Sequence, residues 1–191
     1  VNRPYSPFLA GVMSANPNYW ESSSNKEIKG ITGVERVITA ALNDENSEAN
    51  QLNEVGISTL FSSFGTGTRT WGNRGAGFPS EAGADVFINI QRIMDITHES
   101  LEQAMLQFID RPINQALIDS IRESCNSFIR TLIGRGALLE GSKCLYNPAD
   151  NPATEIAQGK LTFEIIMAGP TPAERITFKS LLDTSLLAQF A

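Results

Sequence analysis

The sequence predicts an α+β fold in which two main amphipathic helices cover a largely antiparallel sheet. Apolar residues recur at three- and four-residue spacing in two long segments, a pattern typical of helices that pack on a core by one face. Shorter segments alternate apolar and polar residues, which predicts strands, and stretches rich in glycine or proline separate them. A chain of 191 residues, 41% of them hydrophobic, can bury the core of one domain.

The N-terminal part of the chain is expected to form two short helices and one strand. Residues 6–15 predict a helix with Pro7 in its first turn, and the turn-forming residues after it predict a loop. The β-branched residues within 34–42 predict a strand. A polar stretch then leads into the second short helix, which Gly56 is placed to end.

Three further strands are predicted in the middle of the chain. Residues 57–61 and 66–71 are expected to pair around a glycine-containing reversal. In residues 86–93, apolar side chains alternate with Asn89 and Gln91. Because successive side chains of a strand point to opposite faces, this alternation predicts a half-buried strand.

Two long helices are expected next. The first is predicted behind Thr97, a candidate N-terminal cap, and the second spans residues 112–133, with Gly134 placed to end it. The apolar stripe of the first helix consists of Leu101, Ala104, Met105, Phe108 and Ile109, and that of the second helix of Ile113, Leu117, Ile121, Cys125, Phe128 and Leu132.

A C-terminal hairpin would complete the sheet. Residues 161–167 predict a strand with alternate apolar side chains on one face. The glycine- and proline-rich residues 169–172 predict a turn, which would lead into a second strand over residues 175–182. The two predicted helices need such a sheet to cover their apolar faces.

The composition argues against several classes of partner. The net charge is -6 and the pI is near 4.8, and no clustered run of Lys or Arg exists, so nucleic-acid binding is not expected. No apolar run approaches the roughly 20 residues needed to span a bilayer, so no membrane partner is expected. The two cysteines, Cys125 and Cys144, lack C-x-x-C spacing and fit a reducing compartment, with Cys125 as a small buried hydrophobic residue.

No catalytic, cofactor-binding or metal-binding residues are predicted. Gly65 and Gly67 are not followed by the helix that a dinucleotide-binding loop requires, so they are interpreted as a tight reversal. Residues 136–143 have the spacing of a P-loop, but Lys and Ser are interchanged, which breaks both of their roles. His98 is the only histidine, and no nucleophile motif lies near it in the sequence.

Three motifs follow one another in a distinctive order. The first contains Leu52, Asn53, Gly56 and Ile57, the second Gly65, Gly67, Trp71, Gly72 and Arg74, and the third Phe87, Ile88, Asn89 and Arg92. In this order they resemble the C-terminal part of the tail sheath proteins of contractile-tail bacteriophages, with Ser58 where that family usually has Asn. Segments around Gly11 and Gly136 also resemble the family, so most of the chain is covered.

The resemblance implies a division of the chain. The N-terminal region of the family is absent and the chain opens on Val1, so the chain is interpreted as a fragment or processed product. Residues 1–30 would then connect to a missing upstream domain, residues 31–175 would form the sheath C-terminal core domain, and residues 176–191 would form a C-terminal strand and arm.

The resemblance also implies a structural virion protein with no enzymatic activity and no cofactor. Its subunits would polymerise helically around a tail tube and contract to drive the tube through the host envelope, with the energy stored in two packings of rigid domains. The implied partners are other sheath subunits, the tail tube protein, and baseplate and tail terminator proteins. The implied location is the virion tail, and the host cytoplasm during assembly.

Three groups of residues are expected to carry this function. A sticky apolar chain end can add a strand to the sheet of a neighbour, and the resemblance implies such an arm. The arm residues are Arg175, Ile176, Phe178, Leu182, Leu186, Leu187 and Phe190. The residues expected to face the tube are Asp150, Glu155 and Lys160, and those expected to hold the structural turn are Gly65, Gly67, Trp71, Gly72, Arg74 and Arg92.

The sequence leaves alternatives open. The chain could come from the sheath of a related contractile machine, such as a pyocin-like particle or a secretion system. A nucleotide-binding enzyme that uses the glycine loop is a second alternative. The C-terminal residues could also pack on their own domain, and the three charged residues assigned to the tube could be surface charge without a partner.

Overall fold

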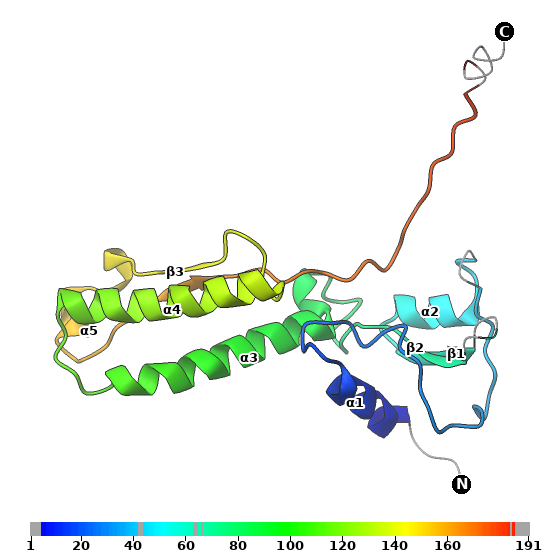
Figure 1. Ribbon diagram of the computed structural model, residues 1–191, viewed down its shortest axis with the longest axis horizontal. Helices are drawn as coiled ribbons and strands as arrows, with labels where there is room; N and C mark the ends of the chain where they lie inside the picture. The colour runs from blue at the N-terminus through cyan, green and yellow to red at the C-terminus, as the bar shows by residue number, and fades with distance from the viewer. Residues whose placement is uncertain (1–4, 42–43, 63–64, 66, 184, 186–191) are drawn as a thin grey trace.

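The computed structural model describes residues 5–41, 44–62, 65, 67–183 and 185. It is elongated, with a long pair of helices at one end and a smaller group of helices and strands at the other (Figure 1). The α+β class and the antiparallel strand pairing are confirmed, although the strands form two separate two-stranded ribbons and not one sheet.

The N-terminal elements largely match the prediction. Helix α1 spans Tyr5–Ala15 and helix α2 spans Glu48–Glu54. Strand β1 (Thr59–Ser62) pairs antiparallel with strand β2 (Thr68–Trp71), with Thr59 opposite Trp71. The helix before Gly56 and the hairpin after it are therefore confirmed.

A segment that the sequence predicts as a loop covers the second edge of β2. The amide of Ile28 donates to the carbonyl of Thr68 at 2.9 Å, and the amide of Thr70 donates to the carbonyl of Lys26 at 3.0 Å. Glu27 and Arg69 form an antiparallel bridge between the same two segments. Strand β2 is therefore hydrogen-bonded on both sides.

The prediction of a strand over residues 34–42 is wrong for residues 34–41, which are the part of this range that the structure describes. This segment caps α2 instead. The Thr39 carbonyl accepts from the Ala49 amide at 3.0 Å, and the Thr39 hydroxyl accepts from the Glu48 amide at 3.0 Å. Since the first amides of a helix have no partner within it, Thr39 satisfies two of them without any neighbouring strand.

The strand predicted over residues 86–93 is also wrong. A 3₁₀ turn, η1 (Ala84–Val86), leads into helix α3 (Ile88–Met105), which ends in the turn η2 (Leu106–Phe108). The buried residues Ile90, Ile93, Thr97 and Leu101 keep helical spacing through the whole segment. Thr97 therefore lies inside the helix and does not cap it.

Helix α4 (Gln115–Arg135) confirms the second long helix, with shifted ends. The Asn114 side chain accepts from the Leu117 amide at 2.8 Å, which is the geometry of an N-cap. At the other end Gly136, with φ of 81°, occupies the left-handed region that glycine reaches without strain. Gly134, which was expected to end the helix, is its penultimate residue.

A second ribbon packs against the helix pair. Strand β3 (Lys143–Leu145) pairs antiparallel with strand β4 (Glu164–Ile166). Between them lie the 3₁₀ turn η3 (Pro148–Asp150) and the short helix α5 (Ala153–Ile156). The alternation predicted for this strand is confirmed, because Leu161, Phe163, Ile165 and Met167 all pack against the core.

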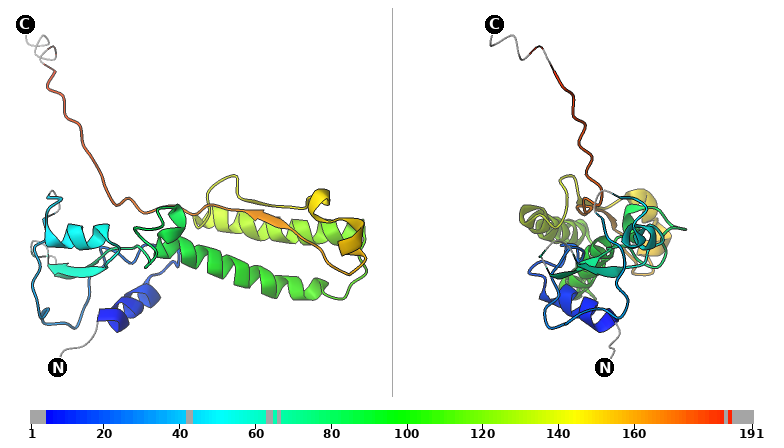
Figure 2. Two further views of the ribbon diagram at one scale, coloured as in Figure 1. Left: turned by 180° about the vertical axis from the view of Figure 1, so that it is seen from behind. Right: turned by 90° about the vertical axis from the view of Figure 1, so that its right-hand side faces the viewer.

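The core lies between α3, α4 and this second ribbon, where the two helices run side by side (Figure 1 and the left view of Figure 2). Helix α3 contributes Ile93, which is 1% exposed, and helix α4 contributes Ile129, which is fully buried. Cys125 is buried in the same cluster, as the sequence predicts. The buried members of the cluster are Ile90, Ile93, Leu101, Leu117, Ile121, Cys125, Ile129, Leu132, Ala137, Leu138 and Cys144.

The second strand of the predicted C-terminal hairpin, over residues 175–182, is not formed. The chain continues past β4 as an extended segment that leaves the domain (Figure 1). A strand is defined by hydrogen bonds to a neighbour, and none of the strands in the described part of the chain pairs with residues 175–182.

The first hairpin gives a stability prediction. The rings of Phe61 and Trp71 meet edge to face, with centroids 4.9 Å apart and an interplanar angle of 76°. We expect Trp71→Ala to lower the free energy of unfolding by roughly 3 kcal/mol, because it removes this packing. Thermal unfolding followed by circular dichroism measures the loss.

The matched control is Trp71→Phe, which keeps an aromatic ring. The buried indole N–H of Trp71 has no hydrogen-bond partner, so its removal breaks no hydrogen bond. A melting temperature of Trp71→Ala equal to that of the unmodified chain would show that the ring contact does not stabilise the hairpin.

Candidate functional site

The described residues contain no group of three or more His, Cys, Asp or Glu side chains that could hold a metal ion. His98, expected at the start of a helix, lies within α3 and is exposed. Cys125 and Cys144 are 4% and 1% exposed. A hydrogen bond with the Cys125 thiol, together with burial, raises the pKa of Cys144 well above its usual range.

The glycine-rich reversal leads into a strand and not into a helix. Gly65 and Gly67 have φ values of 71° and 78°, and β2 begins directly after Gly67. Gly72, with φ of 112°, lies so close to the chain that an added Cβ would be 3.0 Å from the Cα of Ser58. These glycines therefore allow the backbone to reverse and pack closely.

Arg74 makes the most developed contact of the predicted turn residues. Its guanidinium lies 3.9 Å from the ring centroid of Phe78 and 5.4 Å from that of Phe87. It also donates from Nε and Nη2 to one carboxylate oxygen of Glu174, at 2.9 and 2.5 Å. Arg92, the last turn residue, instead donates to the carbonyl of Met13 at 3.4 Å and so ties α3 to α1.

Two buried asparagines link the turn to its surroundings, and sequence reasoning did not single out either as a structural link. Asn73 donates from its side chain to the Asn89 side chain at 2.7 Å. Asn89 donates in turn to the carbonyls of Trp20 at 3.1 Å and Pro170 at 3.2 Å. These partners are far apart in sequence, so no local spacing signals the cluster; the motif match at Asn89 was the sole hint.

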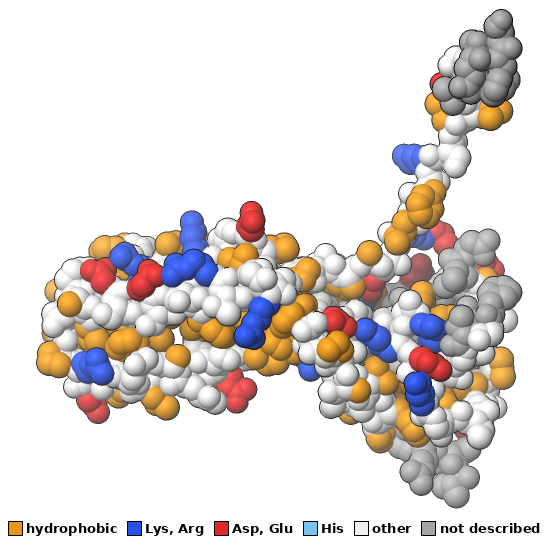
Figure 3. Space-filling view, viewed as in Figure 1, with side chains coloured by type: hydrophobic (Ala, Val, Ile, Leu, Met, Phe, Trp, Pro, Cys, Tyr) orange, Lys and Arg blue, Asp and Glu red, His pale blue; other side chains and the backbone are white. Residues whose placement is uncertain are grey.

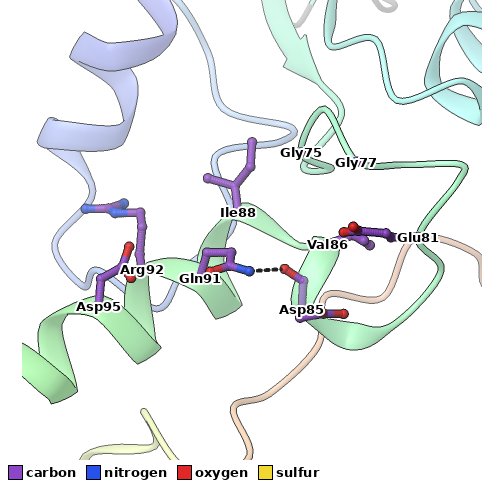
Figure 4. Close-up of a pocket in the computed structure, with 9 residues that line it drawn as sticks. All are labelled: Gly75, Gly77, Glu81, Asp85, Val86, Ile88, Gln91, Arg92 and Asp95. Atoms are coloured by element: carbon purple, nitrogen blue, oxygen red, sulfur yellow. Dashed lines mark hydrogen bonds between the residues drawn. The ribbon is translucent and has the colours of Figure 1, made fainter.

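One open pocket of about 330 Å³ lies beside this region, between the loop after β2 and the start of α3 (Figure 4). Its polar lining includes the carboxylates of Glu81, Asp85 and Asp95 and the guanidinium of Arg92. The Gln91 amide donates to the Asp85 carbonyl at 2.8 Å across its wall. The described residues that line the pocket include no Ser, Thr, Cys, Lys or His.

The predicted arm residues lie on an exposed segment. The arm begins at Arg175, and its described residues up to 183 extend away from the domain, with hydrophobic side chains visible along them (Figure 3). Ile176, Phe178 and Leu182 are 70%, 87% and 89% exposed, and Leu181 is 92% exposed. Arg175 contacts Glu45 of the same chain. Leu186, Leu187 and Phe190 lie outside the described residues.

The residues predicted to face a tube gather at the far end of the helix pair from the arm (Figure 1). Asp150 ends η3 and accepts from the Asn147 side chain at 2.9 Å. Glu155 in α5 forms an ion pair with Lys160 at 3.1 Å. The structure thus brings these three charges into one surface region, separate from the turn and the arm.

No helix in the described part of the chain combines the length and apolar character required to cross a membrane. No family model matches the chain.

Relatives with curated names were found. The chain is 44% identical over 187 residues to the tail sheath protein of Burkholderia phage BcepMu, an alignment that covers 96% of this chain and 39% of that protein. It is 32% identical over 179 residues to a putative prophage major tail sheath protein of Pseudomonas aeruginosa, which covers 92% of this chain and 45% of the relative. The chain thus spans about two fifths of the length of these relatives.

Solved structures share the fold at lower identity. The helical sheath of the anti-feeding prophage in its contracted state matches with a TM-score of 0.79 at 23% identity, covering 94% of this chain and 51% of that one. The sheath complex of an extracellular contractile injection system, also contracted, matches with a TM-score of 0.83 at 19% identity. This match covers 97% of this chain and 53% of that one. The resemblance predicted from the motifs is confirmed: this chain is homologous to part of the tail sheath proteins of bacteriophages.

Proposed function

We propose that this chain is part of a contractile tail sheath subunit, which polymerises around a tail tube and contracts to drive the tube through a host envelope. The observation that carries the proposal is the 44% identity to a phage tail sheath protein over 96% of the chain. In this role the protein acts mechanically, as a virion component assembled in the host cytoplasm, and not as an enzyme. Its partners are its own copies, the tail tube, the baseplate and the tail terminator.

The arm suits a contact between subunits. Four of its apolar side chains are at least 70% exposed, which is costly in water unless a partner covers them. The segment is extended and has free backbone groups to offer to a strand edge in another copy. The proposed arrangement is a strand added to the sheet of a neighbouring subunit, with residues 1–30, 31–175 and 176–191 as connecting segment, core domain and arm.

The second candidate function is the sheath of a related contractile injection machine. The chain shares its fold with contracted sheaths of two such systems, and at 23% and 19% identity this likeness extends to the fold alone. The higher identity to a phage protein favours the phage tail. Genes beside the parent gene distinguish the two, because a phage needs capsid and terminase genes and an injection machine does not.

The arm gives the first functional prediction. Removing residues 183–191 from the full-length parent protein is expected to abolish striated tubes in negative-stain electron microscopy, because the arm loses its end. Phe178→Ser tests the same contact with one side chain, since Phe178 is 87% exposed and gains nothing from its own domain. We expect it to reduce the fraction of subunits in tubes by about tenfold, equivalent to about 1.4 kcal/mol.

The matched control for the arm is Lys179→Ser, which changes the next, polar residue to the same side chain. Strand addition places neighbouring side chains on opposite faces, so this variant should polymerise normally. Unchanged tube formation by both the deletion and Phe178→Ser would contradict the proposed role of the arm.

The charged group at α5 gives the second functional prediction. Glu155→Lys replaces an attractive pair with Lys160 by a repulsive one and reverses the local charge. We expect the full-length variant subunit to co-assemble less with the tail tube. The amount of subunit that sediments with tail tubes measures this. Glu140→Lys, at the other end of α4, makes the same change at an exposed site and should have no effect. Normal co-assembly of Glu155→Lys would identify Glu155 as surface charge without a partner.

A further inference from the structure

The chain between β4 and the arm is held to the domain at several points. Gly169 lies against α3 so closely that an added Cβ would be 2.7 Å from Cδ1 of Ile93 and 2.9 Å from Cδ1 of Ile90. The next residue, Pro170, accepts from the Asn89 side chain at 3.2 Å. The backbone of this segment is therefore fixed to the domain at residues 169 and 170.

The last firm contact before the arm is the ion pair of Arg74 and Glu174. Both side chains are 24% exposed, the lowest exposure of any ion pair among the described residues. Two N–H groups of Arg74 share one oxygen of Glu174, and the guanidinium is held by the rings of Phe78 and Phe87. Charged hydrogen bonds are stronger than neutral ones, and these two side chains are less open to screening by salt than those of the other described ion pairs.

The ion pair one residue further on is of a different kind. The side chains of Arg175 and Glu45 are 69% and 73% exposed. Ion pairs that are this exposed contribute little, because water and salt screen them. The change from a held chain to a free chain therefore falls between Glu174 and Arg175.

We infer that Arg74 is a positioning residue that clamps Glu174 and so sets the point, at Arg175, about which the arm pivots. This inference rests on the proposed role of the arm in joining subunits. Without the clamp the nearest fixed points would be Gly169 and Pro170, and residues 171–174 would join the free segment. At about 3.3 Å per extended residue this adds roughly 13 Å of reach. A longer tether lowers the effective concentration of the arm at the neighbouring sheet, so assembly weakens.

The arm itself contains a probe for the clamp. Trypsin cleaves after Arg175 and after Lys179, and a protease must draw several residues on each side of the cleaved bond into an extended, mobile form. The clamp restrains the residues before Arg175 but not those around Lys179. In the unassembled full-length protein, the ratio of cleavage after Arg175 to cleavage after Lys179 should therefore lie several-fold below the ratio for the denatured chain.

The decisive variant is Arg74→Gln, which removes the clamp and leaves the arm sequence unchanged. We expect it to raise the cleavage ratio to the value of the denatured chain while sites within α4, such as Arg122, stay protected. Glu45→Gln is the matched control, because it breaks the exposed pair of Arg175; its ratio should stay at the native value. An unchanged ratio in Arg74→Gln, or an equal rise in Glu45→Gln, would overturn the inference.

A second variant guards against misfolding. If Arg74→Gln makes the trypsin sites in α4 accessible, Glu174→Gln takes its place. The cleavage ratio of this variant is then compared with the ratio of its own denatured chain. A residue that only stabilised the turn would lower the melting temperature and leave the ratio of the folded protein unchanged. The ratio is measured on unassembled subunits, so it is independent of whether Phe178→Ser impairs tube formation. Failure of the clamp and failure of the proposed function are therefore distinguishable.

Discussion

The buried contact between Asn73 and Asn89 is the constraint on which the arrangement of the other segments depends. Both side chains are almost fully buried, at 1% and 2% exposed. A buried amide is costly unless its donors and acceptors are bonded, and those of Asn89 are satisfied by Asn73, Trp20 and Pro170 together. This one pair therefore fixes the N-terminal segment, the exit of the first hairpin, the start of α3 and the root of the arm relative to one another.

A rigid body with a separate arm follows from this arrangement. The chain before Arg175 is held by packing at Gly169, by the hydrogen bond from the Asn89 side chain to the Pro170 carbonyl, and by the ion pair at Glu174. Beyond it, the described apolar residues Ile176, Phe178, Leu181 and Leu182 find no surface in their own domain and stay exposed. In the proposed sheath, such a division lets subunits change their packing as rigid bodies while the connections between them persist.

Local patterns predicted the features that depend on neighbours in sequence. Helix α4 and the first hairpin follow from periodicity and turn residues. Residues 86–93 were mistaken for a strand because a short run can satisfy both periods, and only the continuation through Thr97 and Leu101 reveals the helix. The contact of Arg74 with Glu174 joins residues 100 positions apart, and no local pattern encodes such a partner.

The helix pair separates the two proposed contact regions. The arm leaves from one end of the pair, and α5 lies at the other end (Figure 2). Helix α4 has 21 residues, and at about 1.5 Å per residue it is roughly 30 Å long. The cluster around Ile93 and Ile129 packs the two helices and the second ribbon into one unit, so we expect a rotation about Arg175 to move α5 together with the helix pair. In the proposed sheath, a small pivot at the neighbour-binding end therefore becomes a large displacement at the tube-facing end.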